Sequence, residues 1–174
     1  TTAIQMATAL GVKVIATAGS DEKCTVCESL GAVKAINYND QDFVSESLTV
    51  TADGVDVILD MVGGDYAQKN VNVCAPKARI VNIAFLRGSK VEIDLMPVML
   101  KQLVITGSTL RSQPLENKAR IAKGVQDHVW PLIENQQFKP IIDHTFALSE
   151  ASQAHTLMES NTHIGKILLI TESI

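Results

Sequence analysis

The sequence predicts an α/β protein whose parallel sheet is covered by helices on both faces. Short apolar segments alternate with helical segments along all 174 residues, which is the pattern of α/β folds. The apolar segments are continuous runs, such as "VDVILDMV" at 55–62, and such runs are typical of strands that are buried on both faces. A hydrophobic content of 46% argues against disorder and indicates a substantial core.

The order of the elements follows from this alternation. Strands are expected at 13–18, 34–38, 55–62, 78–85, 103–110 and 166–170, with a short extended segment within 140–148. Helices are expected at 2–10, 21–30, 40–52, 64–75, 95–101, 115–134 and 149–160. Gly11 and Gly31 close the first two helices. Ser20 and Ser149 are natural N-caps, and Pro76 stops the helix that precedes it.

The charge balance argues against two classes of partner. The net charge is −4 and the isoelectric point is about 5.5, so neither a nucleic acid nor an anionic membrane surface is an expected partner. No apolar stretch approaches the roughly 18–20 residues that span a bilayer. The three cysteines are an odd number, which fits a reducing compartment and predicts a cytoplasmic protein.

Cys24 and Cys27 form a C-x-x-C motif, which zinc and redox sites also use. Both lie inside the helix expected after Ser20, and no second pair or nearby histidine completes a ligand set. Packing within the helix is therefore the favoured interpretation, and no metal site is expected.

The residues that close the strand at 13–18 form the first candidate site. In dinucleotide-binding folds, an acidic residue at the end of the second strand binds the ribose hydroxyls and repels a 2′-phosphate. Here Gly19 and Ser20 follow the strand and leave room beside backbone amides. Lys23 adds a positive charge, and Tyr38 adds a hydroxyl after the next strand. Either these residues converge on a phosphate, or Lys23 is an ordinary surface lysine that pairs with a nearby Asp or Glu.

A Rossmann-type, doubly wound fold also has a first strand and a Gly-rich loop before its first helix. The sequence begins at that helix and contains no G-x-G-x-x-G. We therefore interpret residues 1–174 as an NADP-binding Rossmann-type domain that lacks its first strand and its Gly-rich loop. We expect that this chain alone is not the native folding unit.

Five segments carry a resemblance to a known family: "TTAIQMATALG", "VIATAGSDEKC" with the "LGA" and "INY" that follow, "GVDVILDMVGGDY", "ITGSTLRSQP", and "ES" followed by "HIGKILL". Together they closely resemble the quinone oxidoreductase (zeta-crystallin-like) branch of the medium-chain dehydrogenase/reductase superfamily. The resemblance implies the cofactor-binding part of an oxidoreductase whose GroES-like catalytic domain is absent from this chain. It also implies zinc-independent hydride transfer from NADPH to quinones or other electrophilic, conjugated carbonyls.

The resemblance assigns a place to each candidate residue. It puts Gly19, Ser20, Lys23 and Tyr38 around the adenosine phosphate. The other cofactor-binding residues that it implies follow later strands and are Gly63, Ala84, Phe85, Leu86, Ser108, Thr109 and Leu110. Plain hydrophobic packing also explains the apolar side chains after the strand at 78–85. The catalytic residues are unknown.

Two alternatives stay open. One is a non-catalytic Rossmann-type module for dimerisation or interaction, and the other is a different α/β nucleotide binder such as a methyltransferase. A methyltransferase usually has an acidic residue at the end of its second strand, unlike this chain. The expected partners are a small quinone or conjugated carbonyl substrate and a second copy of the chain. The homodimer is expected to form through the edge strand at 103–110, because an exposed apolar edge favours pairing.

Overall fold

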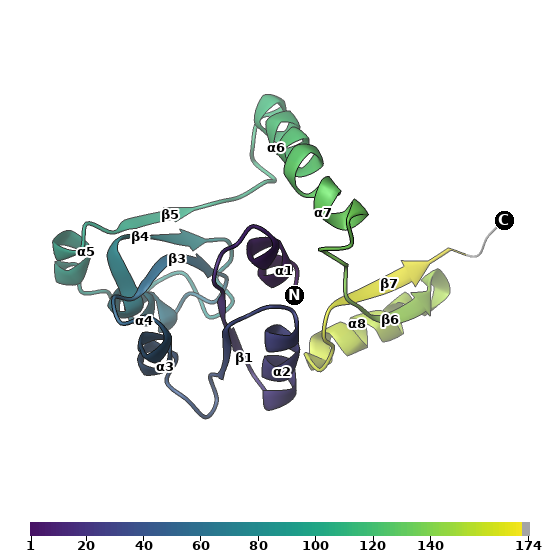
Figure 1. The fold of residues 1–174 in the computed structure, drawn as a ribbon. Helices are drawn as coiled ribbons and strands as arrows, with labels where there is room; N and C mark the ends of the chain where they lie inside the picture. Colours follow the sequence, from purple (N-terminus) through teal and green to yellow (C-terminus); the bar gives the residue numbers. More distant parts are fainter. Residues whose placement is uncertain (172–174) are drawn as a thin grey trace. The chain divides into compact units, whose positions relative to one another are not determined.

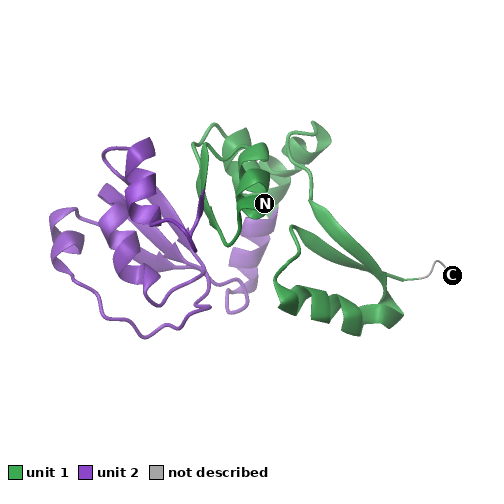
Figure 2. Ribbon diagram, turned by 90° about the horizontal axis from the view of Figure 1, so that it is seen from below, with its two compact units in different colours: residues 1–35, 123–174 green, residues 36–122 purple. Residues whose placement is uncertain are grey.

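The computed structural model describes residues 1–171 (Figure 1). Its helices are α1 (Thr2–Ala9), α2 (Asp21–Ser29), α3 (Phe43–Val50), α4 (Tyr66–Val73), α5 (Met96–Leu100), α6 (Leu115–His128), α7 (Trp130–Glu134), the 3₁₀ turn η1 (Leu148–Glu150) and α8 (Ala151–Ser160). Its strands are β1 (Ile15–Ala18), β2 (Lys34–Asn37), β3 (Val55–Asp60), β4 (Cys74–Asn82), β5 (Val104–Gly107), β6 (Ile142–Ala147) and β7 (Lys166–Ile170). The chain divides into two compact units (Figure 2): unit 1 comprises residues 1–35 and 123–174, and unit 2 comprises residues 36–122.

Unit 2 is built around a three-stranded parallel sheet in the order β3-β4-β5. Each strand pairs with the next strand of the sequence, and a helix lies in each connection, as parallel pairing requires. The core joins Val71 of α4 to Cys74, Ala78 and Ile80 of β4. Helix α4 therefore covers the face of the sheet on which the Ile80 side chain lies.

The opposite face of this sheet carries exposed apolar side chains. Val57 is 64% exposed and Leu59 is 50% exposed, whereas Ile58 between them packs against the core cluster. Side chains alternate between the two faces of a strand. The sequence predicts strands that are buried on both faces of the sheet. Within unit 2, only the face that α4 covers is buried.

Lys101 fixes the junction between α4 and β4. Its ε-ammonium donates to the backbone oxygens of Asn72 at 3.0 Å and of Cys74 at 2.8 Å. Its own carbonyl accepts the Lys77 N–H at 2.6 Å. The last carbonyls of a helix have no partner within the helix, so this cation supplies donors at the point where the chain leaves α4 for β4.

Unit 1 joins segments that are far apart in the sequence. The Gln5 side chain donates to the Lys139 carbonyl at 2.9 Å and accepts the Lys139 N–H at 3.0 Å. Strands β6 and β7 pair in parallel, with α8 in their connection. Strands β1 and β2 form a separate two-stranded sheet.

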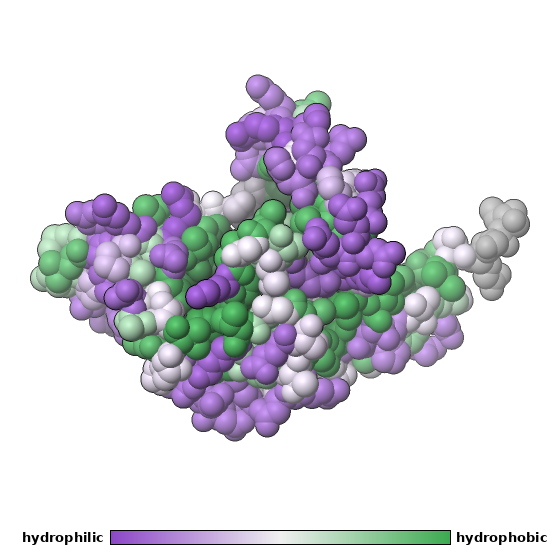
Figure 3. Space-filling model, viewed as in Figure 1, coloured by the Kyte–Doolittle hydropathy of each residue, from purple (hydrophilic) through white to green (hydrophobic). Residues whose placement is uncertain are grey.

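Helix α6 is amphipathic, and its polar side chains dominate the face shown in Figure 3. None of its described residues is buried. Ile121 is 44% exposed and Val125 is 43% exposed, so its apolar stripe is only partly covered.

Several predicted boundaries are wrong for identifiable reasons. The predicted helix at 64–75 ends at Val73, and β4 begins at Cys74 rather than at residue 78. Pro76 therefore lies inside a strand. The register of β3 against β4 shifts between Val55 and Val57, so this proline falls in an irregular stretch of the ladder, where a missing N–H costs little.

Two further predictions fail near prolines and caps. The predicted helix at 115–134 is divided into α6 and α7, because Pro131 stands in the first turn of a new helix. Ser149 lies within η1 instead of capping α8. Glu150 precedes α8, and its carboxylate accepts the Ala147 N–H at 3.0 Å.

The predicted α/β class with parallel, Rossmann-type strand order is confirmed. Read as the second to sixth strands, β1 to β5 give the pairings 3-2 and 4-5-6 of the doubly wound order. Among residues 1–171, β1 pairs only with β2, and β3 pairs only with β4.

Candidate cofactor-binding site

The carboxyl ends of β3, β4 and β5 lie at one edge of the unit 2 sheet. Asp60 pairs in register with Asn82, and Asn82 pairs with Gly107. The loops that follow these three residues therefore start side by side. Ligands bind outside the carboxyl ends of parallel strands in open α/β sheets, so this edge is the candidate site of unit 2.

Backbone hydrogen bonds join the loop after β3 to the loop after β4. The N–H groups of Leu86 and Arg87 donate to the carbonyls of Met61 at 3.1 Å and Val62 at 2.8 Å. The Gly64 N–H donates in return to the carbonyl of Gly88 at 2.9 Å. The two loops thus form one hydrogen-bonded pair, which we call the loop pair (residues 61–65 and 83–88).

Two consecutive glycines allow this pairing. Gly63 and Gly64 have φ values of +65° and +55°, a left-handed conformation that costs most side chains energy. A Cβ on Gly63 would lie 2.6 Å from the Gly88 carbonyl oxygen and 2.8 Å from the Phe85 ring. A Cβ on Gly64 would lie 2.9 Å from atoms of Arg87. The packing of the loop pair itself therefore requires glycine at both positions.

A buried carboxylate lies beneath the first loop. Asp60 is only 4% exposed, and its Oδ1 accepts the N–H of Val62 at 2.7 Å and that of Gly63 at 3.2 Å. Its Oδ2 accepts a side-chain N–H of Asn70 at 3.1 Å, and Asn70 is 3% exposed. The Asp60 carbonyl also accepts the Ile83 N–H at 2.7 Å. One residue thus bonds to both loops.

Sequence reasoning did not select Asp60 or Asn70. The available signal was an acidic residue that ends an apolar strand and precedes a Gly-Gly pair. A charged group at the end of a buried strand needs several donors, and turn amides next to it are the natural source.

Arg87 of the second loop contacts Asp65 of the first loop and Tyr66 of α4. The Arg87 guanidinium lies 5.4 Å from the Tyr66 ring centroid and 3.3 Å from the Asp65 carboxylate. The Phe43 and Tyr66 rings stack at 5.0 Å. Burial raises the pKa of Tyr66, and Arg87 lowers it by less.

The predicted residues after β4 and β5 are close together at this edge. Phe85 is 50% exposed and Leu86 is 78% exposed, so half of Phe85 and most of Leu86 are open to solvent. Ala84, between β4 and Phe85, is half-buried. Ser108 donates its N–H to the Asn82 carbonyl at 3.0 Å, which fixes the start of the loop that continues to the exposed Thr109 and Leu110.

Tyr38 directly follows β2 and is 37% exposed. The turn that carries it is held by Asn37, whose side chain accepts the Asn39 N–H at 3.2 Å and donates to Asp40 at 2.6 Å. Tyr38 belongs to unit 2.

Gly19, Ser20 and Lys23 lie together at the start of α2 in unit 1. The predicted N-cap is confirmed, because the Ser20 hydroxyl accepts the Lys23 N–H at 3.2 Å. The Lys23 ε-ammonium donates to the backbone carbonyl of Asn161. This partner is a backbone carbonyl and not the nearby Asp or Glu that the surface-lysine interpretation expects.

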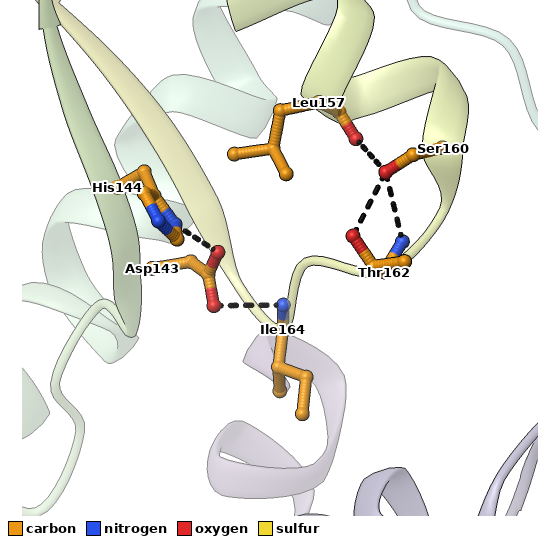
Figure 4. A network of polar contacts seen from close by, with 6 residues as sticks. All are labelled: Asp143, His144, Leu157, Ser160, Thr162 and Ile164. Carbon is orange, nitrogen blue, oxygen red and sulfur yellow. Dashed lines mark hydrogen bonds and ion pairs between the residues drawn. The ribbon is translucent and has the colours of Figure 1, made fainter.

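Asn161 ends α8 in the left-handed conformation, at φ +56°. Around it, the Ser160 hydroxyl donates to the Leu157 carbonyl at 2.7 Å and lies 2.8 Å from the Thr162 hydroxyl oxygen (Figure 4). The Asp143 carboxylate accepts the Ile164 N–H at 3.0 Å. The carbonyl that holds Lys23 therefore lies on a turn that other hydrogen bonds already fix.

The Asp143 carboxylate also contacts His144 Nδ1 at 2.6 Å. The pKa of Asp143 is lowered, first by the Ile164 N–H and then by His144. His163 Nδ1 is buried and has no hydrogen-bond partner among the described residues.

The three cysteines are buried or half-buried. Burial raises the pKa of all three thiols, that of Cys74 to about 11, and all three are free. Within residues 1–171, no cluster of three or more His, Cys, Asp or Glu side chains could hold a metal ion. In the same part of the chain, no helix is long and apolar enough to cross a membrane.

The chain is similar to several known proteins. A family model described as zinc-binding dehydrogenase matches residues 1–125. Quinone oxidoreductase from Rattus norvegicus is 30% identical over 95% of this chain and 49% of its own length. A 2-haloacrylate reductase from a Burkholderia species is 28% identical over 94% of this chain and 50% of its own length. The crystal structure of Escherichia coli quinone oxidoreductase complexed with NADPH has a TM-score of 0.82 and 25% identity over 97% of this chain and 53% of that one.

The fold and these similarities define a Rossmann-type cofactor-binding domain of the oxidoreductase class. The chain belongs to the zinc-binding dehydrogenase family, and the predicted resemblance to its quinone oxidoreductase members is confirmed. It spans about half the length of the curated relatives that it matches.

Proposed function

We propose that the chain is the cofactor-binding part of an NADPH-dependent oxidoreductase that reduces quinones or related electrophilic, conjugated carbonyls by hydride transfer. The substrate class is supported by the names of two relatives, a quinone oxidoreductase and a 2-haloacrylate reductase. Both names describe electron-poor, conjugated acceptors.

The residues at the end of β1 are the main support for NADPH as the cofactor. The strand ends at Ala18 without an acidic residue, and Ser20 and Lys23 follow at the start of α2. A 2′-phosphate brings close to two negative charges and several acceptor oxygens. One Lys23 donor is bonded to the Asn161 carbonyl, and an ammonium group has three donors, so two remain for a phosphate.

The nicotinamide would supply the hydride, and residues of this chain would bind and orient it. Gly19, Ser20, Lys23 and Tyr38 are proposed to bind the adenosine phosphate end. The residues proposed to line the rest of the cofactor are Gly63, Ala84, Phe85, Leu86, Ser108, Thr109 and Leu110. The exposed apolar surface of Phe85 and Leu86 suits a wall that excludes water from the nicotinamide side.

The proposal extends to assembly. Strand β5 pairs with β4 along one edge, and no other strand of residues 1–171 pairs with it. Val104 is 41% exposed and Ile105 is 45% exposed, and an apolar free edge favours pairing with another strand. We propose a homodimer through residues 103–110. Light scattering of the intact protein at micromolar concentration should give twice the monomer mass, and a monomer with this strand exposed would contradict the dimer.

Two further parts of the proposal concern the chemistry and its setting. Hydride transfer is proposed to be zinc-independent, as the resemblance to the quinone oxidoreductase branch implies. A reducing, cytoplasmic compartment is proposed because the three thiols are free. Metal analysis of the active, intact protein should find no stoichiometric zinc.

The test of cofactor choice is kcat/KM for NADPH and for NADH with 1,4-benzoquinone as the acceptor, in the intact protein and in Lys23→Ala. Charge-assisted hydrogen bonds contribute about 1.5–3 kcal/mol, which corresponds to a loss of roughly 10–150-fold with NADPH. Use of NADH should be nearly unchanged. Lys13 is an exposed lysine of unit 1, and Lys13→Ala should leave both cofactors unaffected. A wild-type preference for NADH, or equal losses with both cofactors in Lys23→Ala, would contradict the proposed role of Lys23.

A further inference from the structure

We infer that Asp60, held by Asn70, is a positioning residue for the cofactor site, acting through the loop pair that presents Phe85 and Leu86. The inference rests on the proposed function for its ligand. Its structural part depends only on contacts within unit 2.

The first step is the direction of the bonds from Asp60. Its carboxylate accepts the N–H groups of Val62 and Gly63, and its carbonyl accepts that of Ile83. Ile83 begins the second loop of the pair, and Val62 and Gly63 lie within the first. A single residue at the end of β3 therefore sets where both loops leave the sheet.

Most backbone hydrogen-bonding groups of the first loop already have partners within the protein. The carbonyls of Met61 and Val62 accept from the second loop, and the Gly63 carbonyl accepts the Tyr66 N–H at 3.1 Å. The N–H groups at 62 and 63 are directed to Asp60. The first loop therefore has few free backbone donors, and we infer that it contributes to the site through the position of the loops rather than by donating hydrogen bonds to the ligand.

The third step is the side chain that the loop pair orients. A Cβ on Gly63 would approach the Phe85 ring within 2.8 Å, so this backbone already lies against that ring. A shift of the first loop would move the contact, and with it the exposed faces of Phe85 and Leu86. The burial of Asp60 and Asn70, at 4% and 3% exposure, makes the geometry stiff, because an unpaired charge there would be costly.

We call the Asp60–Asn70 pair, with its hydrogen bonds to the two loops, the clamp. The experiment exchanges these two side chains in the intact protein. Asp60→Asn puts an amide against the Asn70 amide, and Asn70→Asp puts a second carboxylate beside the first. The double variant Asp60→Asn/Asn70→Asp restores one amide and one carboxylate, and the amide oxygen introduced at position 60 can still accept the two loop N–H groups. Asp56→Asn makes the same chemical change at an exposed position of β3 and is the matched control.

Two readouts are compared. Hydrogen exchange without cofactor reports the amides of the loop pair, and titration with NADPH and NADH reports the Kd for each cofactor. Asp60→Asn should speed exchange at residues 62–64 and 86–88 and raise the Kd for both cofactors about 10-fold. The double variant should return both readouts to within about 3-fold of the wild type, and Asp56→Asn should change neither.

The outcomes separate the inference from the proposed function. Unchanged loop exchange in Asp60→Asn overturns the clamp. Faster exchange with unchanged Kd, or a double variant that folds but shows no rescue, overturns the positioning role. If the wild type binds neither cofactor, the proposed function and the positioning role both fail, and loop exchange still decides whether the clamp holds the loops.

Discussion

Two regions that carry candidate cofactor-binding residues, one in each unit, are held in different ways. In unit 2, the loops beside β3 and β4 are joined by backbone bonds, by two left-handed glycines and by a buried carboxylate. In unit 1, the half-buried Lys23 makes one side-chain hydrogen bond to a backbone carbonyl. The difference indicates that the first region is shaped before any ligand arrives, whereas the second has a donor group that can change partners.

Substitution of Gly63 should have the largest effect and is the strongest test of the loop pair in unit 2. Gly63→Ala combines a left-handed backbone with a Cβ 2.6 Å from the Gly88 carbonyl oxygen, and we expect a loss of about 3 kcal/mol in the free energy of unfolding. Urea denaturation measures it. Gly124→Ala, where a Cβ on helix α6 meets nothing within 4 Å, should instead stabilise by about 0.5–1 kcal/mol. Equal effects from the two substitutions would contradict the packing described for the loop pair.

The junction between α4 and β4, where Lys101 binds backbone carbonyls, gives a second test. Lys101→Met keeps most of the aliphatic chain and removes the ammonium from the carbonyls of Asn72 and Cys74. We expect a loss of about 1.5–3 kcal/mol by denaturation. As a control, Lys123→Met breaks an exposed pair with Asp127 one helical turn away and should cost below about 0.5 kcal/mol. If Lys101→Met costs no more than this control, the cation does not hold the junction.

A pH series tests whether the Cys74 thiol, at the junction between α4 and β4, is protected from water in the folded state. Burial raises the pKa of the Cys74 thiol from its ordinary value of 9.0 to about 11, and Lys101 lowers it by less. The folded state therefore holds this proton more tightly than the unfolded chain. The stability that this provides should be fully present below about pH 9 and lost as the pH rises toward about 11. Denaturation of Cys74→Ala over the same range should show a flatter slope, and parallel slopes would indicate that the thiol is not protected.

Substitution of Lys23, at the start of α2 in unit 1, should have the smallest effect on stability. Lys23→Ala removes one exposed hydrogen bond, and we expect the free energy of unfolding to change by less than about 1 kcal/mol. A much larger loss by thermal or urea denaturation would mean that Lys23 is mainly structural, which would remove the contrast between the two regions.

The local patterns of the sequence predicted much of the fold. Ser20 capped α2 as expected, because a side-chain acceptor directly before a helix satisfies its first N–H groups. The pattern failed at Pro76, which lies in an irregular stretch of β4, since nothing local shows where a ladder bond is absent. It also failed at Pro131, which lies in the first turn of α7 and so divides the predicted helix.

The site was predictable by position more than by interaction. Residues in the loops after strands, such as Phe85 after β4 and Ser108 after β5, lie at the edge to which parallel strands bring them. Asp60 was not selected, because its value depends on donors from Asn70 and from a turn whose geometry is set by tertiary contacts. The Lys23 partner lies 138 residues away, and short sequence patterns do not report contacts at that separation.

The paired hydrogen bonds between Gln5 and Lys139 also bear on the order of folding. They join residues separated by 134 positions, whereas the β3-β4-β5 sheet pairs strands that are consecutive in the sequence. The entropy cost of loop closure rises by about 0.6 kcal/mol for each doubling of the loop, and contacts between distant residues slow folding. Unit 2 is therefore expected to acquire its strand pairing first. Pulse-labelled hydrogen exchange during refolding should protect the amides of β4 before the Lys139 amide, and the reverse order would show that the distant pair forms the nucleus.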